Sequence, residues 1–289
     1  MTKKISISVI MTCFNRRKKT VACLKSLLLQ EDVEQYEINF FICDDGSTDG
    51  TSSAVLELCP SATVVKGTGN LFWAKGMAKA LKAANLVPCD FYLMVNDDVS
   101  FERDMLKTMM ESFYALDCEG AISGAFKDPI TGDYSYGGER IIKRGFKEKT
   151  VEVLPNGEKM NFCDRANWNC FLISQDYYKR IGDIDDYYAH SYADYDYSNR
   201  IVQTGGKIGI SFRYVGTCSR NSKKNTWMDS DLSTFERLKK LHRPNGIPIK
   251  SAIHYWGKFD RKYFIFRIAR PYLAIFKDCI RKKRNSNLE

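Results

Sequence analysis

The sequence predicts an α/β fold built on a doubly wound, mostly parallel sheet, and three observations carry that prediction. Strand-like and helix-like segments alternate over the first 126 residues, which is the order of a parallel sheet wrapped by helices. One run, FYLMV (91–95), is apolar throughout, as in a central strand buried on both faces. Beyond residue 126 the pattern changes to turn-rich β segments and then to helices.

Each element follows from its own pattern. ISISVIMT (5–12) alternates as a strand does, and Val21, Leu24 and Leu28 recur at helical spacing. The other predicted strands are 37–43, 62–65 and 121–126, and the other predicted helices are a segment carrying Ala54, Val55 and Leu58, then 72–86, 102–116, 174–182 and 192–204, the last ended by Gly205 and Gly206.

Composition bounds the size and compartment. A chain of 289 residues, 44% hydrophobic, can bury the core of one large domain with appendages or of two small domains. It opens without the continuous apolar stretch of a signal peptide, and no window reaches the roughly 18 apolar residues of a spanning helix. Ten cysteines without a C-x-x-C pair favour reduced, buried thiols, with zinc the weaker alternative. We expect a cytoplasmic protein.

The net charge of +9 is concentrated at one end of the chain. Residues 261–289 hold nine basic residues against Asp278 and Glu289, a net of +7, which leaves +2 for the other 260 residues. A basic groove across the body is therefore not expected, and nucleic acid is excluded as a partner. The tail also carries an apolar stripe, Tyr272, Ile275, Phe276 and Cys279, so it reads as a basic helix that lies on an anionic membrane surface or docks on the domain.

Polar clusters follow three of the predicted strands where each strand ends. Thr12-Cys13-Phe14-Asn15 follows the first, Asp44-Asp45-Gly46-Ser47 the second, and Asn96-Asp97-Asp98 the fourth. Carboxyl ends of parallel strands share one edge, where open α/β sheets bind ligands. Each cluster alone is also ordinary turn or capping chemistry, but two acidic pairs at one edge need a cation or hydrogen-bond donors to compensate their charge. The sequence therefore predicts a ligand site at this edge.

The chain lacks the usual glycine-rich phosphate loops. Neither Gly-x-Gly-x-x-Gly nor Gly-x-x-x-x-Gly-Lys-Ser/Thr follows any predicted strand. Asp or Asn oxygens that ligate Mg²⁺ or Mn²⁺, with the ion bridging a diphosphate, provide an alternative device. We expect that device here.

Four segments resemble the motifs of family 2 glycosyltransferases, inverting enzymes of the GT-A fold. They are SVIMTCFNR (8–16), CDDGSTDGT (43–51), NDDV (96–99) and HSYADYDYSNRI (190–201). GNLFWAKGM (69–77) and YVGTCSRN (214–221) further resemble a bacterial branch found among cell-surface polysaccharide enzymes. The resemblance implies a Rossmann-like nucleotide-binding half, a mixed β region on the acceptor side, and C-terminal helices.

The resemblance implies the donor contacts. Thr12 and Phe14 would line the nucleobase pocket and Asp45 would accept the base N3–H, which suits a UDP- or dTDP-sugar. Asp97 would lie near the ribose and phosphates. The remaining donor-binding candidates on matching motifs are Asn15, Asp44, Asn70, Lys75 and Asn96.

The resemblance assigns the metal to Asp98, and the sequence departs from the family around it. Asn96 stands where the family's D-x-D element has its first acid, so it brings an amide oxygen without charge. Many relatives place a histidine near the metal where this chain has Gly216-Thr217-Cys218. A third protein ligand is therefore not assigned.

Asp194 matches the family's general base, which accepts the proton of the acceptor hydroxyl. Ala193 stands where a glutamate commonly precedes it, and Asp196 is the competing acid. Either one also reads as an acid at a helix N-terminus. Candidates for the acceptor side are Trp168, which fits a sugar face or the core equally, then Asn169 and His190.

The resemblance spans about residues 5–220 and divides the chain. We predict a GT-A domain over 1–220, with a nucleotide-sugar donor half at 1–126 and an acceptor and catalytic half at 127–220. The extension 221–289 follows, with 219–250 a polar lobe or linker and a last helix starting at Pro271.

The predicted activity is inverting transfer of a sugar to a hydroxyl of a glycan or polyprenyl-linked glycan in bacterial surface polysaccharide synthesis. The place is the cytoplasm, with the tail a candidate for peripheral attachment to the inner face of the cell membrane. Two rivals remain. A sugar nucleotidyltransferase would carry a glycine-rich loop after the first strand, and a non-catalytic carbohydrate-binding module would not require both Asp98 and Asp194.

Overall fold

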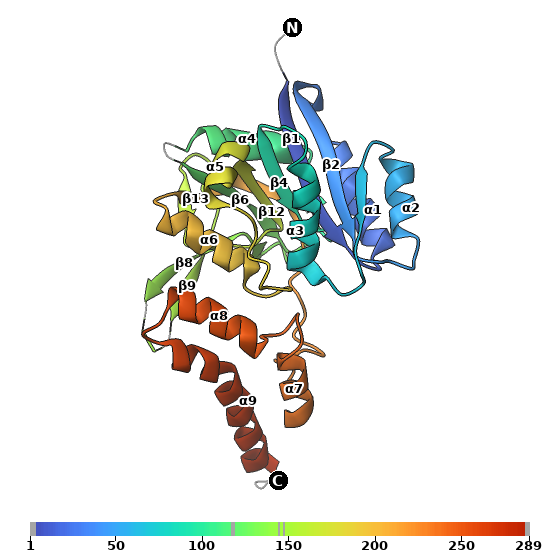
Figure 1. Ribbon diagram of the computed structural model, residues 1–289. Coiled ribbons are helices and arrows are strands. Elements are labelled where there is room, and N and C mark those ends of the chain that lie inside the picture. The colour runs from blue at the N-terminus through green and yellow to red at the C-terminus, as the bar shows by residue number, and fades with distance from the viewer. Residues whose placement is uncertain (1–3, 117–118, 144, 147, 287–289) are drawn as a thin grey trace.

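The computed structural model describes residues 4–116, 119–143, 145–146 and 148–286, and it folds as strands wrapped by helices (Figure 1). The strands are β1 Ile5–Cys13, β2 Tyr36–Asp44, β3 Thr63–Lys66, β4 Phe91–Val95, β5 Ser100–Phe101, β6 Gly120–Lys127, β7 Tyr134–Tyr136, β8 Gly138–Lys143, β9 Lys149–Val153, β10 Asn161–Cys163, β11 Arg165–Ala166, β12 Cys170–Ser174 and β13 Lys207–Thr217. The helices are α1 Arg17–Leu28, η1 Val33–Gln35, α2 Thr51–Leu58, α3 Phe72–Ala84, α4 Met105–Tyr114, α5 Gln175–Ile181, α6 Ala193–Gln203, α7 Thr234–Leu241, α8 Ile249–Phe259 and α9 Phe264–Ser286.

The main sheet is parallel on one side and mixed on the other. Its strand order is β10-β13-β6-β12-β4-β1-β2-β3, with β5 on β13 and β7 on β6. Strands β4, β1, β2 and β3 run parallel, whereas β12 runs antiparallel to both β4 and β6. A small sheet, β11-β8-β9, stands beside it. This arrangement confirms the predicted α/β fold with a parallel half and a mixed β region.

The parallel half is buried on both faces because its strands carry apolar side chains on both. On β1, Ile7, Val9 and Met11 join a core that includes the buried side chains of α1 and α4. Ile10 points the other way and joins the core with Met77 and Leu81 of α3. Successive side chains of a strand alternate between faces, so one strand feeds two cores. Helices α3, α5 and α6 lie on the near face of the sheet in Figure 1.

The strand ends meet at one edge as the sequence predicted. Thr12 and Cys13 at the end of β1 pair in register with Cys43 and Asp44 at the end of β2. Strand β4 ends at Val95, directly before the polar cluster. The three polar clusters therefore leave the sheet on the same side.

The mixed half holds elements that sequence patterning missed. Strand β13, which runs parallel to β6 and antiparallel to β10, was not predicted. Its sequence contains Gly209, Arg213 and Gly216, and side chains at Gly209 and Gly216 would collide with the neighbouring chain. The strand also carries Ile208, Ile210, Phe212, Tyr214 and Val215, which favour a strand, and Gly216 allows the close approach of the Ser100 backbone.

One prediction for the C-terminal region was wrong. The polar stretch 219–250, read as a lobe or linker, contains α7, whose first turn has a capping box between Ser233 and Glu236. The last helix does not start at Pro271: α9 begins at Phe264 and Pro271 lies inside it. Arg267, in the turn before this proline, donates through Nε to Asp260 at 2.8 Å, which ties α9 to the end of α8.

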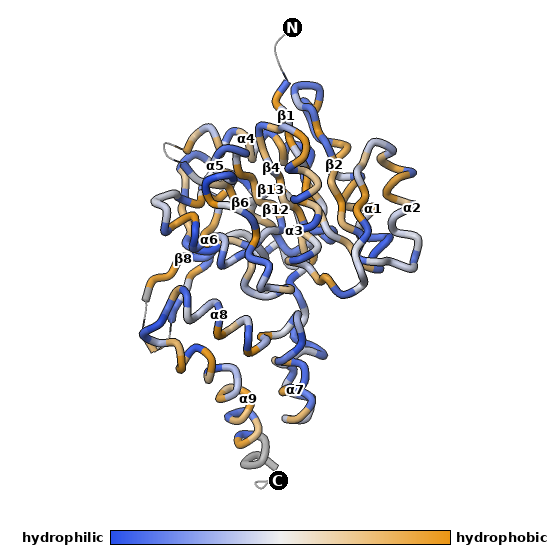
Figure 2. Tube along the Cα trace, in the orientation of Figure 1, coloured by the Kyte–Doolittle hydropathy of each residue, from blue (hydrophilic) through white to orange (hydrophobic). Residues whose placement is uncertain are grey.

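Helices α7, α8 and α9 form the lower part of the molecule in Figure 1, and α9 packs on both others. Figure 2 shows apolar segments alternating with polar ones along α9. Ile275 is buried, whereas Ile265, Phe266, Leu273, Phe276 and Ile280 remain exposed. The helix is thus docked on one side and apolar on its open side. Among the described residues, no helix combines the length and apolar character that crossing a membrane requires, and no described cysteine forms a disulfide.

Candidate active site

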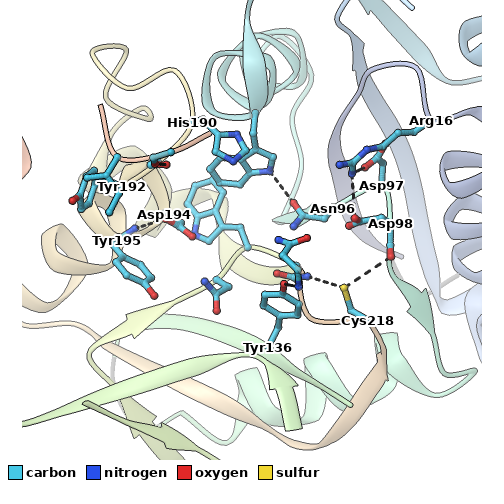
Figure 3. Close-up of a pocket in the computed structure, with 18 residues that line it drawn as sticks. Arg16, Asn96, Asp97, Asp98, Tyr136, His190, Tyr192, Asp194, Tyr195 and Cys218 are labelled. Carbon is cyan, nitrogen blue, oxygen red and sulfur yellow. Dashed lines mark hydrogen bonds and ion pairs between the residues drawn. The ribbon is translucent and has the colours of Figure 1, made fainter. Parts of the chain in front are cut away.

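A cavity of about 400 Å³ lies at the carboxyl edge of the sheet, between the parallel half and the mixed half of the fold (Figure 3). Seven of the side chains predicted for the site line it: Asn96, Asp97, Asp98, Trp168, Asn169, His190 and Asp194. They come from chain segments about 100 residues apart, from the loop after β4 to the start of α6. The fold therefore brings both predicted acidic centres, Asp98 and Asp194, to one cavity.

A basic side chain that the sequence reasoning left unassigned balances the acids after β4. Arg16 Nη1 lies 3.1 Å from Asp97 Oδ1 and 3.1 Å from Asp98 Oδ2. Asp97 also accepts from Thr20 Oγ1 at 3.1 Å, and Lys19 Nζ is 3.7 Å from Asp98 Oδ2. The two carboxylates thus face a shared guanidinium instead of each other alone.

Asp97 and Asp98 differ in exposure. The Asp97 side chain is 6% exposed, and desolvation raises its pKa while Arg16 opposes that rise. The Asp98 side chain is 19% exposed and opens to the cavity. Asp97 therefore anchors α1 to the loop after β4, and Asp98 is the acid that a ligand in the cavity can reach.

Asn96 is held by an indole. Trp73 Nε1 donates to Asn96 Oδ1 at 2.8 Å, and the backbone N–H of Asn96 donates to Asn169 O at 3.3 Å. Trp73 in turn stands edge to face with Trp168, 5.8 Å between ring centres, and with His190, 6.3 Å away. The side-chain oxygen of Asn96 thus positions the aromatic wall of the cavity through its hydrogen bond with Trp73.

Asp194 lies on the opposite side of the cavity from Asp98 in Figure 3. It occupies the first turn of α6, which begins at Ala193. The preceding residue, Tyr192, has a φ of 77°, a left-handed conformation that is strained for a residue with a side chain. Burial without a neighbouring cation raises the pKa of Asp194 to about 6, opposed by hydrogen bonds from Tyr195 N–H at 2.9 Å and from Asn167. A carboxylate with this pKa is ionised at neutral pH and is a competent proton acceptor.

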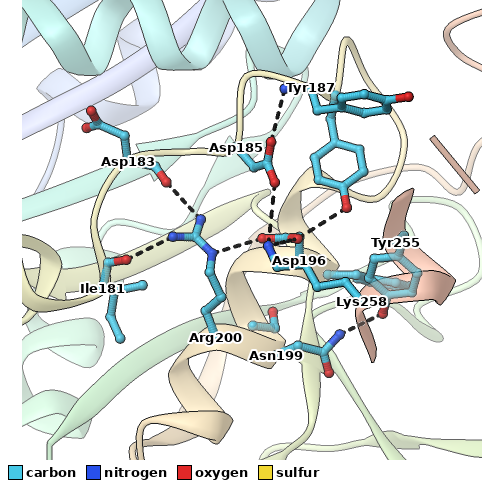
Figure 4. Close-up of polar contacts among 12 residues, drawn as sticks. Ile181, Asp183, Asp185, Tyr187, Asp196, Asn199, Arg200, Tyr255 and Lys258 are labelled. Atoms are coloured by element: carbon cyan, nitrogen blue, oxygen red, sulfur yellow. Dashed lines mark hydrogen bonds and ion pairs between the residues drawn. The ribbon is translucent and has the colours of Figure 1, made fainter. Parts of the chain in front are cut away.

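Asp196 lies on another face of α6 and outside this cavity (Figure 4). It is fully buried and accepts from Arg200 Nε and Lys258 Nζ, each at 2.8 Å, and from the Tyr188 hydroxyl at 3.2 Å. These contacts tie α6 to α8. The structure therefore brings Asp194, and not Asp196, into contact with the space where a ligand fits.

The aromatic and amide candidates form the floor of the cavity. Trp168 is 1% exposed and stacks on Phe171 with 5.2 Å between ring centres, so most of its ring belongs to the core. Its Nε1 is buried without a hydrogen-bond partner among the described residues. Asn169 Nδ2 contacts Cys218 Sγ at 3.4 Å. Burial lowers the pKa of His190, which is therefore neutral at pH 7.

The polar residues after β1 and β2 stand apart from this cavity. Thr12 Oγ1 donates to Cys43 O at 3.1 Å, and Phe14 is 47% exposed. Asn15, at φ 50°, accepts from Thr48 N–H through Oδ1 at 2.8 Å, and buried Asp44 accepts from Ser47 N–H at 2.8 Å and from the Ser52 hydroxyl. These contacts join the two loops into one rigid wall.

Asp45 shapes the loop that begins at Gly67. Its two carboxylate oxygens accept four backbone N–H groups, from Thr68, Gly69, Leu71 and Phe72, at 2.8 to 3.1 Å. An ionised carboxylate offers about four acceptor positions, so a bond to a base N–H requires one of these donors to be released. Asn70 in this loop and Lys75 on α3 are exposed.

Comparison with known proteins identifies the family of this chain. The sequence matches glycosyl transferase family 2 over residues 8–182. The chain belongs to this family. No match was found among curated proteins.

Three solved structures share the fold of this glycosyltransferase. A mannosyltransferase from Pyrobaculum calidifontis, PcManGT, in complex with GDP-Man and Mn²⁺, matches over 99% of this chain and 81% of its own at 13% identity and a TM-score of 0.53. The TarS 1-349 structure of S. aureus matches over 89% of this chain and 73% of its own at 14% identity and a TM-score of 0.53. GalNAc-T7 with UDP, GalNAc and Mn²⁺ matches over 76% of this chain and 44% of its own at 14% identity and a TM-score of 0.58. At these identities the likeness establishes the GT-A fold.

The donor atoms of this family 2 enzyme fit a metal only if a substrate supplies most of the ligands. Among the described residues, no three His, Cys, Asp or Glu side chains gather as a metal site. Burial and the nearby Asp98 raise the pKa of Cys218 to about 12, so this thiol is protonated at neutral pH in the metal-free site. Asp98 is the accessible carboxylate, and Mg²⁺ commonly takes one or two carboxylates plus phosphate oxygens and water. The site fits an ion held between Asp98 and a diphosphate.

Sequence reasoning missed several lining residues of this glycosyltransferase, namely Arg16, Trp73, Tyr136, Asn167, Ser191, Tyr192, Tyr195, Asn221, Gly246 and Ile247. Arg16 and Trp73 lie inside the quoted segments 8–16 and 69–77, so position in a motif could have found them. Gly246 and Ile247 come from the stretch read as a lobe or linker, and Ser191 Oγ holds this stretch by donating to Gly246 O at 2.6 Å. No pattern in the sequence announces that contact.

Proposed function

We propose that this chain is an inverting glycosyltransferase that moves a sugar from a UDP- or dTDP-sugar to a hydroxyl of a glycan or lipid-linked glycan. The observation that carries the proposal is one cavity with two acids in different surroundings. Asp98 lies beside Arg16 and Lys19, which suits the charged end of a donor, whereas Asp194 accepts hydrogen bonds from the neutral Tyr195 N–H and Asn167. An inverting displacement needs a leaving-group side and a base side, and this cavity offers both.

Asp194 is the proposed general base. The acceptor hydroxyl loses its proton as its oxygen bonds to the anomeric carbon, and the bond from that carbon to the nucleoside diphosphate breaks. The proton goes to a carboxylate oxygen of Asp194. A base with a pKa of about 6 is both available at neutral pH and strong enough to accept this proton in the transition state.

The donor diphosphate belongs on the other side. Asp98 would hold Mn²⁺ or Mg²⁺ together with diphosphate oxygens, and the ion offsets negative charge on the departing nucleoside diphosphate. Arg16 is half exposed and lines the same cavity, so its guanidinium is a fixed donor for phosphate oxygens. Asp97 orients Arg16 from a buried position.

The loops after β1 and β2 are the proposed nucleoside wall. Phe14 presents an exposed ring on which a base can stack. Asp45 acts through the loop that it holds by four backbone N–H groups. The proposed donor-binding side chains are Thr12, Phe14, Asn15, Asp44, Asp45, Asn70, Lys75, Asn96 and Asp97.

The proposed catalytic domain is 1–220, with its donor half at 1–126 and its acceptor half at 127–220. The extension 221–289 supplies Gly246 and Ile247 to the cavity wall, which supports a role on the acceptor side. The setting we propose is bacterial surface polysaccharide synthesis, on the resemblance of segments 69–77 and 214–221.

Nucleotide binding tests the metal assignment. UDP or dTDP should raise the melting temperature by a few degrees at about 100 Kd, more with Mn²⁺ or Mg²⁺ than with EDTA, and Asp98→Ala should abolish that difference. Asp176→Ala is the matched control, because its side chain is 98% exposed. Metal-dependent binding that survives Asp98→Ala would overturn the metal assignment. Stabilisation by GDP in place of UDP and dTDP would overturn the choice of donor nucleotide.

The open side of α9 is a proposed contact with an anionic membrane surface. Exposed Leu273 and Phe276 lie on a helix that also carries Lys277 and Arg281. Replacing both apolar residues with glutamate should weaken co-sedimentation with phosphatidylglycerol vesicles about tenfold or more. Leu86→Glu, at a residue 85% exposed and far from α9 in sequence, should leave it unchanged. Equal sedimentation of all three proteins would dismiss the contact.

A further inference from the structure

A second cavity, of about 460 Å³, adjoins the active site and lies against α9. It is lined by residues of the small sheet β11-β8-β9, the start of α6, and helices α8 and α9, of which the last two lie in the lower part of Figure 1. Tyr192, Tyr195 and Ile247 line both this cavity and the active-site cavity. A ligand that reaches Asp194 can therefore extend past these three side chains into the second space.

Two buried arginines line the second cavity. Arg165 on β11 is 5% exposed and forms a two-point ion pair with Glu148, at 2.6 and 3.1 Å. Arg267 on α9 is also 5% exposed, and its Nε donates to Asp260 at 2.8 Å. Its Nη2 lies 3.7 Å from Glu148, which is an ion pair without a hydrogen bond. The two guanidiniums therefore share one glutamate.

Their hydrogen-bonding capacity is not used up. Nη1 and Nη2 of Arg267 and Nε of Arg165 are buried and have no hydrogen-bond partner among the described residues. A buried charged group whose N–H donors lack acceptors carries a substantial desolvation cost. The four hydrogens on the two Nη atoms of Arg267 thus require acceptor oxygens that the described protein does not supply.

The walls suit an organic ligand better than a free ion. The Trp256 ring lies 5.1 Å from the Arg267 guanidinium and 5.6 Å from that of Arg165. Tyr192 is held in its left-handed conformation by stacking on Tyr255, 4.7 Å between ring centres, at the boundary of the two cavities. Flat aromatic faces beside charged forks are typical of surfaces that bind sugars and their acidic substituents.

We propose that this second cavity binds an anionic group of the acceptor, a phosphate or a carboxylate, through Arg267 with Arg165 beside it. The inference rests on the proposed glycosyl transfer and adds to it that the acceptor is acidic at a position away from the reacting hydroxyl. Glu148 weakens non-specific anion binding in the cavity, because its negative charge pairs with Arg165 and lies 3.7 Å from Arg267. An oxyanion therefore binds tightly only where its oxygens can accept hydrogen bonds from the Nη atoms of Arg267.

The oxyanion has two chemical sources. A phosphate belongs to a lipid-linked acceptor, whose chain would leave along the exposed apolar side of α9 from Leu273 onward. A carboxylate belongs to an acidic sugar in a soluble glycan. Farnesyl phosphate and glucuronate represent these sources, and inorganic phosphate represents the charge without chain or ring.

The test is calorimetric titration of the full chain with each probe, with UDP and Mg²⁺ saturating so that the donor side is occupied. Arg267→Gln should weaken binding of the accepted probe about tenfold or more, because it removes charge-assisted hydrogen bonds. Arg103→Gln, at an exposed arginine outside α9 and outside both cavities, should not. Glu148→Gln should tighten binding, since it removes the negative charge nearest to both guanidiniums while Arg165 keeps its ion pair with Glu139 at 3.5 Å. A purely structural role for these residues predicts no gain.

Ala274→Trp guards against misfolding of the Arg267 variant. Ala274 is exposed and lines the cavity, so a large side chain there should block binding while leaving the arginine contacts in place. Tighter binding of farnesyl phosphate than of glucuronate identifies the lipid source, and the reverse identifies the acidic sugar. If no probe binds wild type, or if Glu148→Gln and Ala274→Trp bind as wild type does, water alone satisfies the arginines and the proposal fails. Absence of UDP binding would instead defeat the proposed function.

Discussion

Two faces of helix α6 carry the same residue type in opposite surroundings. Asp194 faces the active-site cavity, and its described hydrogen-bond donors, Tyr195 N–H and Asn167, are neutral. Asp196, two positions on, is fully buried between Arg200 and Lys258. Burial without a counter-charge raises the pKa of Asp194 toward the working pH, whereas burial between two cations makes Asp196 part of the connection to α8. The proposed base, Asp194, and the structural acid, Asp196, are thus separated by a rotation of about 200° around one helix.

The largest expected effect is on the cavity face. Asp194→Asn should lower the rate of transfer from the sugar nucleotide by about 10²- to 10⁴-fold, because the amide keeps the shape of the side chain but cannot accept the proton. Steady-state UDP release from the sugar nucleotide, with and without acceptor, measures this loss.

The UDP-induced thermal shift of Asp194→Asn should match that of wild type, because Asp194 lies across the cavity from Asp98. A variant that loses nucleotide binding together with turnover would mean that the substitution disturbs the whole site. Near-normal turnover in Asp194→Asn with none in Asp196→Asn would move the base to the other face.

The second effect concerns the buried face. Asp196→Asn leaves Arg200 and Lys258 without their shared carboxylate, which typically costs about 3 kcal/mol for a buried pair. The melting temperature should fall by about 6 °C or more. Asp176→Asn, whose side chain is 98% exposed, is the matched control and should change the free energy of unfolding by less than about 0.5 kcal/mol.

Folded Asp196→Asn should keep much of its turnover per molecule. If its stability equals that of wild type while its activity vanishes, the comparison between the two faces is wrong. Asp196 would then take part in catalysis and would not be needed to pack α8 on α6.

How far the sequence predicted this molecule differs between its halves. Segments such as FYLMV (91–95) and the polar cluster after it fixed the parallel sheet and its ligand-binding edge, because strand periodicity and strand ends are local properties. The sequence also offered Asp194 and Asp196 together, and only the packing of α8 on α6 separates them. Gly246 at the cavity wall depends on a contact across 55 residues of chain, which no local pattern reveals.

The smallest effect is the pH dependence that the cavity face predicts. Since Asp194 must be ionised to accept a proton, kcat/KM should fall about tenfold per pH unit below a pKa of about 6. Stability follows the opposite sign. The folded pKa lies above the ordinary value of about 3.9, so the contribution of Asp194 to folding is fully present below that value and is lost as pH rises through 6.

Asp194→Asn cannot ionise, so its stability relative to wild type should increase as the pH rises from 4 to 7, by about 2 kcal/mol, and level off above pH 7. Paired thermal melts of the two proteins across this range measure the difference. A gain in stability at pH 7 in the variant that loses turnover identifies a carboxylate that is kept desolvated for chemistry at a cost to folding. An acid limb near pH 4, with a stability difference that does not vary with pH, would show instead that water or a cation reaches Asp194, and the contrast between the two faces of α6 would rest on geometry alone.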